Sequence, residues 1–164
     1  MARTTEKQKT QNSQKTVASN RKARHDYDIL ETIEAGIVLT GTEVKSLRGG
    51  RAQMADSFAT ARDGGIVLHG VHIPPYEQGS HWNHEPERPR KLLLHRAEID
   101  HLRSKAEQGG LTLVPLRIYF DHGLAKVELA LARGRRKYDK RQVLKEREHA
   151  LEMKRALRHE GRRR

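Results

Sequence analysis

Four histidines near the middle of the chain are the first candidates for chemistry. His69 and His72 fall in an apolar run typical of a β-strand, and His81 and His84 follow in a proline-rich stretch. Residues three apart on a strand face opposite sides, so His69 and His72 cannot chelate one metal ion together. The chain has no cysteine, which excludes disulfides and thiolate zinc sites. We therefore expect no metal site and no cofactor.

The sequence does not support a serine nucleophile either. Ser57 and Ser80 have no evident histidine and aspartate partners, and the sequence contains neither a nucleophile elbow nor a P-loop. An RNA-processing enzyme would need an acidic or histidine cluster that we cannot assemble. We expect a binding protein without catalytic residues.

Positive charge is the strongest feature of the composition, at a net +12 over 164 residues. Residues 133–164 hold 14 Lys or Arg against five Asp or Glu, and residues 1–25 hold seven against one. Residues 26–132 are slightly acidic, with 12 basic and 15 acidic side chains. Two cationic arms on a near-neutral body indicate a polyanionic partner, most commonly RNA or DNA. A merely solubilising tail is the alternative.

Nothing in the sequence predicts export or membrane insertion. No apolar run approaches the ~18 residues of a membrane span. The N-terminal residues lack the apolar region of a secretory signal. Together with the absence of cysteine, this favours a cytoplasmic protein.

The body alternates short apolar runs with turn signals, which predicts six strands in three hairpins. We expect the hairpins to turn near Glu34–Gly36, Asp63–Gly65 and Asp121–Gly123. The apolar residues expected to face inward in the first and last hairpins are Ile29, Ile33, Ile37, Leu39, Val127, Leu129 and Leu131.

Two helices are predicted between these hairpins. Thr40 and Glu43 have capping-box spacing at the start of the first helix, and Gly49 and Gly50 end it. The second helix lies within residues 95–110, with Ile99, Leu102 and Ala106 on one face. Residues 74–90, which contain four of the five prolines, form a long exposed loop.

Short antiparallel strands either close into a barrel or leave edge strands whose unpaired N–H and C=O groups can pair with another chain. We therefore predict a mainly β fold, a small antiparallel OB-like barrel of about six strands with two to three helices and basic arms. The pattern alone also allows an open α+β sheet. The predicted organisation is a polar, disordered arm over 1–19, a core over 20–132 and a basic tail over 133–164.

The tail predicts a helix that needs a partner. Asp139 and Gln142 suit a helix start, and no Gly or Pro follows until Gly161. Its apolar residues form only a thin, broken stripe, so the helix should order when phosphates neutralise its charge.

Base stacking on clustered aromatic side chains cannot be the core's main mode of RNA recognition, because only seven aromatic residues are scattered along the chain. Rigid elements instead present basic side chains that suit phosphates of a folded RNA. These are Lys45, Arg48, Arg51, Arg88, Arg90, Lys91 and Arg96.

Four stretches, in order, carry a family resemblance. They are NRKARHDY (20–27), GTEVKSLRGGRA (41–52), RKLLL (90–94) and GRRKYDKRQVLKERE (134–148). Together they resemble the small protein B family, the SsrA (tmRNA)-binding proteins of bacterial trans-translation. The resemblance implies an OB-type barrel that binds the tRNA-like domain of tmRNA and enters stalled 70S ribosomes with it. The barrel would replace the missing anticodon arm, and the protein would not be an enzyme.

Carried over by position, Asn20, Glu34 and Leu93 match tmRNA-contacting residues of the family. Glu34, expected at a hairpin turn, would accept hydrogen bonds from base or ribose donors. Leu93 would offer an apolar contact, although a core strand position is the alternative. With the basic side chains, the predicted tmRNA-binding set is Asn20, Lys22, Arg24, Glu34, Lys45, Arg48, Lys91 and Leu93.

The tail matches the family's basic segment, which lies near the decoding centre and the empty mRNA channel. Tyr138 stands where members often carry His, a change that keeps base stacking but removes a titratable imidazole. Beyond Lys154 the chain departs from the family pattern. The predicted ribosome-binding set is Arg135, Arg136, Lys137, Tyr138, Lys140, Arg141 and Lys145.

Overall fold

The computed structural model describes residues 14–79, 81–135 and 144–154. The chain forms two compact units, residues 1–134 and 135–164. The named elements of the first unit are β1 (Gln14–Ser19), α2 (Arg21–Asp26), β2 (Tyr27–Ile37), α3 (Gly41–Arg48), β3 (Phe58–Arg62), β4 (Gly65–His69), β5 (Arg90–Leu93), α4 (Arg96–Glu107), β6 (Leu111–Asp121) and β7 (Leu124–Gly134).

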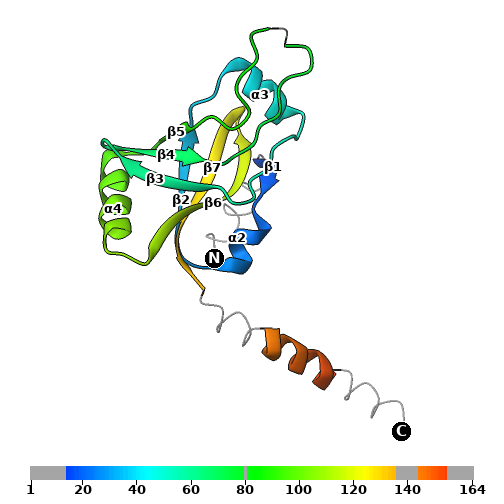
Figure 1. Ribbon diagram of the computed structural model, residues 1–164, viewed down its shortest axis with the longest axis vertical. Helices are drawn as coiled ribbons and strands as arrows, with labels where there is room; N and C mark the ends of the chain where they lie inside the picture. The colour runs from blue at the N-terminus through cyan, green and yellow to red at the C-terminus, as the bar shows by residue number, and fades with distance from the viewer. Residues whose placement is uncertain (1–13, 80, 136–143, 155–164) are drawn as a thin grey trace, which may run out of the picture. The chain divides into compact units, whose positions relative to one another are not determined.

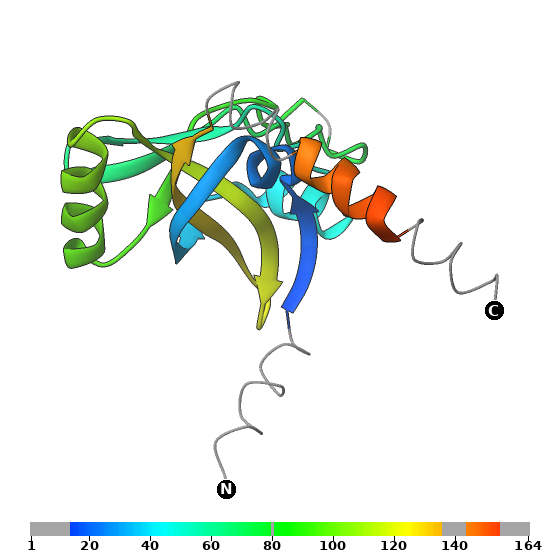
Figure 2. The same cartoon turned by 90° about the horizontal axis from the view of Figure 1, so that it is seen from below.

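Six of these strands close into a ring in the order β6-β3-β4-β5-β2-β7, because β7 pairs with both β2 and β6. β1 pairs with β6 beside this ring, and all the pairings are antiparallel. The curved strands are seen from two sides in Figures 1 and 2. The prediction of a small antiparallel barrel with helices is confirmed, and the open-sheet alternative is wrong.

The local features of the sequence produced the expected elements. β3 and β4 form a hairpin whose turn places Asp63 and Gly64 at positive φ, 48° and 72°. β6 and β7 form the last hairpin, with its turn at His122 and Gly123. α3 begins at the predicted capping box, where the Glu43 carboxylate accepts from the Thr40 amide at 2.7 Å.

The prediction of a hairpin that turns near Glu34–Gly36 is wrong. Residues 27–37 form the single strand β2, which runs along β7 and then reaches β5. Gly36 lies where the two strands approach closely, since a Cβ on Gly36 would lie 3.2 Å from the Leu93 Cβ. The glycine therefore serves a close backbone approach and not a turn.

Part of the predicted disordered arm is also ordered. Residues 14–19 form β1, which pairs with residues 117–121 of β6. The short helix α2 follows and was not predicted. The proposed organisation into arm, core and tail otherwise stays a prediction.

Most of the apolar side chains form one core, to which α3 contributes Leu47 and α4 contributes Leu102. A second, smaller cluster lies where Ala23 of α2 packs with residues of β6 and β7. Ile29 packs in this second cluster, whereas Ile33 packs against the first. A register shift between Ile29 and Glu31 reverses the alternation of β2, which explains the difference.

The second unit contains a helix over residues 144–154. Its described side chains are exposed, including Leu144, Leu151 and Met153. That this helix needs RNA to order stays a prediction. No helix in the described ranges is long and apolar enough to cross a membrane.

Candidate nucleic-acid interface

Glu34 is the centre of a polar cluster on the outside of the barrel. Its carboxylate accepts a hydrogen bond from the Lys126 ammonium at 2.6 Å and another from the Tyr119 hydroxyl. These bonds from Lys126 and Tyr119 lower the pKa of Glu34, so the group stays ionised at neutral pH. The Glu34 side chain is nevertheless 45% exposed, which leaves oxygen lone pairs free to accept from a ligand.

A second carboxylate, Glu128, lies directly opposite Glu34 in the β2–β7 pairing. Each has its own cation, since Arg117 donates to Glu128 at 2.7 Å as Lys126 donates to Glu34. The Arg117 guanidinium also lies over the Tyr119 ring, 4.4 Å from its centroid. Like charges facing across a strand pair would repel, so the two cations are what make this arrangement stable.

Leu93 lies beside Glu34. Its side chain is 53% exposed, so the alternative of a core strand position is wrong. A surface hollow is lined by Thr32–Glu34 of β2, by Leu93–His95 and by Glu98. The structure thus brings an ionised acceptor and an apolar side chain, 59 positions apart in the sequence, into one accessible depression.

Asn20 occupies a different kind of position. It is only 5% exposed and caps α2, where its Oδ1 accepts from the Ala23 amide at 3.0 Å. Its Nδ2 donates to the Pro115 carbonyl at 3.2 Å, and its own amide donates to the Leu116 carbonyl at 2.7 Å. The side chain is used within the protein, so Asn20 positions α2 against β6.

α2 itself presents two predicted basic residues. Lys22 and Arg24 are each 57% exposed, and each forms an ion pair. Lys22 pairs with Asp56 at 2.5 Å, and Arg24 lies 3.9 Å from Glu128. Exposed pairs of this kind contribute little stability and can exchange partners for phosphates.

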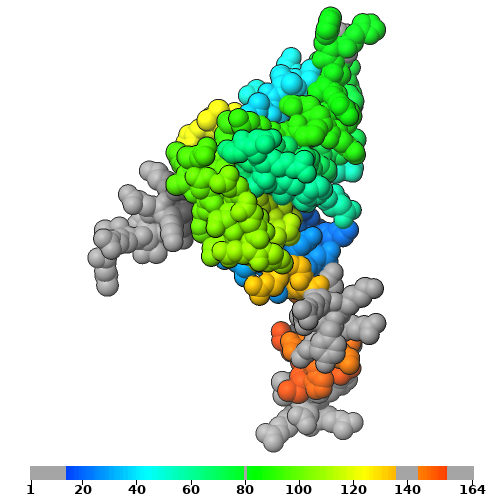
Figure 3. Space-filling model, turned by 60° about the vertical axis from the view of Figure 1, so that its left-hand side comes forward, coloured from blue at the N-terminus to red at the C-terminus, as the bar shows by residue number. Residues whose placement is uncertain are grey.

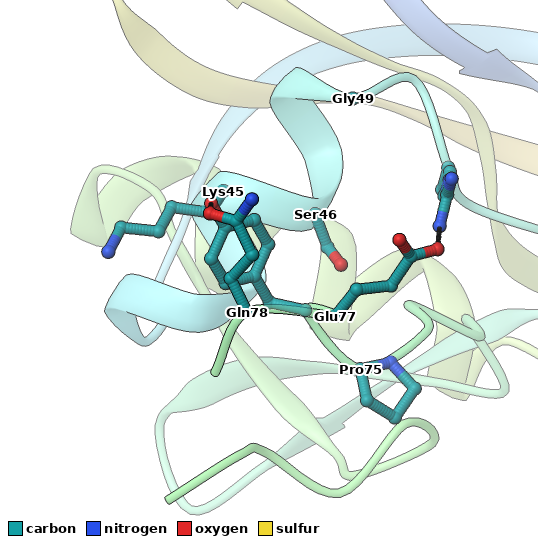
Figure 4. A pocket seen from close by; sticks show the side chains of 8 residues that line it. Lys45, Ser46, Gly49, Pro75, Glu77 and Gln78 are labelled. Carbon is teal, nitrogen blue, oxygen red and sulfur yellow. Dashed lines mark hydrogen bonds and ion pairs between the residues drawn. The ribbon is translucent and has the colours of Figure 1, made fainter. Parts of the chain in front are cut away.

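Two predicted basic residues lie on the exposed side of α3. Lys45 lies over the Tyr76 ring, 5.4 Å from its centroid, and Arg48 lies 6.0 Å from that of Phe120. The loop after β4 packs against this helix and forms a pocket with it, shown in Figure 4. Arg51, in the same pocket, forms an ion pair with Glu77.

The buried side of α3 carries an ionic network that sequence reasoning missed. Glu43 is fully buried, and Arg88 and Arg90 donate to its carboxylate at 2.6–2.8 Å. Burial alone would raise the pKa of Glu43, but bonds from Arg88, the Thr40 amide and Arg90 lower it to about 2. Arg90 is itself 1% exposed. Arg88 and Arg90 are therefore structural, although we predicted phosphate contacts for them.

The remaining predicted residues are exposed or lie outside the described part. Lys91 is an exposed residue of β5, and Lys145 is exposed in the helix over 144–154. Arg135 is the last described residue before the gap. The other five predicted ribosome-binding residues are not described, namely Arg136, Lys137, Tyr138, Lys140 and Arg141.

Three of the histidines and serines considered for chemistry form hydrogen bonds within the protein. His84 is buried and contacts the Thr42 hydroxyl and the Ile73 carbonyl, at 2.9 and 2.8 Å. His69 contacts the Thr60 hydroxyl at 2.9 Å, and Ser57 donates to the Met54 carbonyl at 2.6 Å. Ser80 is outside the described residues. Among those described, no three His, Cys, Asp or Glu side chains are grouped to hold a metal ion.

Comparison with known proteins gives a consistent result. The sequence pattern of the SmpB protein family matches residues 17–159. The chain belongs to the SmpB protein family. An "SsrA-binding protein" of Acidothermus cellulolyticus is 63% identical over 147 residues, covering 90% of this chain and 92% of the relative.

Further comparisons agree with this family. An "SsrA-binding protein" of a Parafrankia species is 62% identical over 143 residues, covering 87% of this chain and 90% of the relative. A chain of the solved structure "tmRNA-SmpB: a journey to the center of the bacterial ribosome" is 55% identical, with a TM-score of 0.64. That match covers 77% of this chain and 93% of the solved one. The predicted family resemblance is confirmed.

Proposed function

We propose that this protein binds the tRNA-like domain of tmRNA through its barrel and delivers tmRNA to stalled ribosomes for trans-translation. Membership of the SmpB family supports the proposal, as do relatives named for SsrA binding. The observation that carries it is the shared hollow of Glu34 and Leu93, an exposed site with both a hydrogen-bond acceptor and an apolar contact.

The chemistry of this site suits an irregular RNA surface. The ionised Glu34 accepts from base amino or imino groups or from a ribose 2′-hydroxyl, and Leu93 packs against a base or sugar. Lys126 neutralises the Glu34 carboxylate and holds it in position for this contact. Lys22, Arg24, Lys45, Arg48 and Lys91 supply further exposed charge from α2, α3 and β5. Asn20 acts through the position of α2.

The two units divide the work in this proposal. The barrel takes the place of the missing anticodon arm, and the tail enters the decoding centre and the empty mRNA channel. The second unit, residues 135–164, holds 13 Lys or Arg against five Asp or Glu, a net +8 that suits a channel lined by rRNA phosphates. The protein acts by binding alone, as a cytoplasmic factor without catalytic residues or cofactor.

Sequencing the RNA that co-purifies with the full-length protein tests the proposed partner. Strong enrichment of tmRNA is expected. Bulk rRNA without tmRNA would instead indicate a ribosomal or assembly protein and contradict the proposal.

Truncation tests the division of work. Arg133 and Gly134 still pair with β2, so the chain should be cut after Gly134 and not earlier. The truncated protein should keep tmRNA binding with a shallower salt dependence, and tagging of stalled nascent chains should stop. Full tagging by the truncated protein, or loss of tmRNA binding along with tagging, would overturn the division.

A further inference from the structure

The segment between β4 and β5 projects from the barrel beside α3, as Figures 1 and 3 show. Its outer turn is closed by one side chain, because Asn83 Oδ1 accepts from the Tyr76 amide at 2.9 Å. Asn83 Nδ2 donates to the Tyr76 and Gly79 carbonyls at 2.8 and 2.7 Å. His84, the next residue, is buried between Thr42 and Ile73.

The base of the same segment is anchored by the Glu43 network. Arg88 and Arg90 both donate to Glu43, and Arg90 also donates to the Val71 and Pro86 carbonyls at 2.7 and 2.9 Å. The described residues on both sides of this turn are therefore held by side-chain hydrogen bonds, so a ligand that binds there would not have to order them first.

This anchored turn presents the one tryptophan of the chain to solvent. Trp82 immediately precedes Asn83 and is 89% exposed, more than any other large apolar side chain in the described ranges. A tryptophan held outward on a fixed turn does nothing for the core. Exposed indoles on rigid supports are typical of contact sites, since they bring a large flat surface with little entropy to lose.

The surroundings indicate the chemical class of the partner. The turn packs on α3, where Lys45 lies over the Tyr76 ring, and Lys45 and Arg48 are exposed on that helix. Of the acidic residues in this segment, Glu77 pairs with Arg51 and Glu87 lies 3.4 Å from His72, while Glu85 is exposed. An exposed aromatic side chain beside an element that carries cations is an arrangement by which proteins bind unpaired nucleotides. Resting on the proposed function, we propose that Trp82 stacks on an unpaired RNA base while α3 contacts the neighbouring phosphates.

This contact is separate from the Glu34 hollow. The hollow is lined by parts of β2, the end of β5 and the start of α4, none of which belongs to the turn. The base belongs either to tmRNA or to rRNA of the ribosome, and the experiment distinguishes these two sources.

The single tryptophan makes the test direct, because all indole fluorescence of the full chain comes from Trp82. The protein is prepared with 5-hydroxytryptophan at position 82, which is excited at longer wavelengths than the tryptophans of ribosomal proteins. It is titrated with the tRNA-like domain of tmRNA and, separately, with stalled ribosomes carrying tmRNA. Stacking should quench the emission and shield it from acrylamide in one of the two titrations. Ultraviolet crosslinking and mass spectrometry should then find Trp82 joined to a nucleotide of the RNA that quenched it.

Substitutions at Trp82 supply the second readout. Trp82→Ala should weaken the affinity in the quenching titration about tenfold, whereas Trp82→Phe should retain most of it. Leu124→Ala is the matched control, because Leu124 is 66% exposed at the start of β7 and its substitution should have no effect on the affinity.

One outcome is that the wild-type protein binds tmRNA while the emission of Trp82 is not quenched and its substitution leaves the RNA affinity unchanged. In that case the stacking proposal is wrong and the proposed function stands. A crosslink to a ribosomal protein in place of RNA would likewise overturn it. If the wild-type protein fails to bind tmRNA at all, the proposed function itself fails.

Discussion

Glu34 and Glu43 have similar partners and opposite roles. Each carboxylate accepts hydrogen bonds from two side chains, and its pKa is lowered by them. Glu43 is fully buried between Arg88 and Arg90, whereas Glu34 is 45% exposed between Lys126 and Tyr119. Exposure, and not pairing, therefore separates a carboxylate that is available to a ligand from one that holds the fold together.

The largest effect is expected from Glu43→Gln. The substitution keeps the shape but leaves the buried Arg90 without its counter-charge, so the free energy of unfolding should fall by about 3–5 kcal/mol. Urea denaturation measures this. Glu34→Gln makes the same chemical change at the exposed site and is the control. Equal losses of unfolding free energy in the two variants would show that Glu34 holds the fold together as Glu43 does.

Acid should remove most of the Glu43 contribution. Because folding lowers its pKa from 4.5 to about 2, this carboxylate contributes full stability above the unfolded pKa. The contribution, about 3 kcal/mol, should be lost as the pH falls from about 4.5 towards 2. Denaturation as a function of pH should show this loss in the wild-type protein and not in Glu43→Gln. Parallel pH profiles in the two proteins would refute it.

Asn20→Ala should destabilise the protein by about 1–2 kcal/mol, because it removes the cap of α2 and a buried bond to Pro115. Asn20→Ser retains a capping oxygen and should lose less. Thermal melts of both variants show whether Asn20 acts by positioning α2 or by contacting RNA directly. A tmRNA affinity that falls in Asn20→Ala without any loss of stability would assign Asn20 to the RNA surface instead.

Leu93→Ala should change stability least, by under about 0.5 kcal/mol, since the side chain is half exposed. Its tmRNA affinity should nevertheless fall about tenfold, because the apolar contact is lost. Filter binding and urea denaturation on the same preparation separate the two effects. A large loss of stability would show that the Leu93 side chain packs in the core.

The parts of the fold that depend on neighbouring residues were predictable from the sequence. The turn at Asp63 and Gly64 and the capping box of Thr40 and Glu43 act over a few residues, and both formed as expected. The glycine in β2 was misinterpreted because its reason for being there, the close approach of Leu93, lies 57 positions away in the sequence.

The candidate site was predictable only in part for the same reason. The β6–β7 hairpin, which was predicted, places Tyr119 opposite Lys126, so their proximity could have been found from the turn. Their bonds to Glu34 span 85 and 92 positions and depend on the closure of the barrel. Family resemblance selected Glu34 and Leu93, but only the structure distinguishes the exposed Leu93 from the buried Asn20.

The assignment of Glu34 to the RNA surface is decided by the tmRNA affinity of full-length Glu34→Gln, measured together with its free energy of unfolding. We expect the free energy of tmRNA binding to weaken by about 1–3 kcal/mol, since the amide is a weaker acceptor and no longer pairs with Lys126. Stability should stay within about 0.5 kcal/mol of the wild-type value. Wild-type affinity in a stable Glu34→Gln protein would contradict the assignment of this hollow to tmRNA.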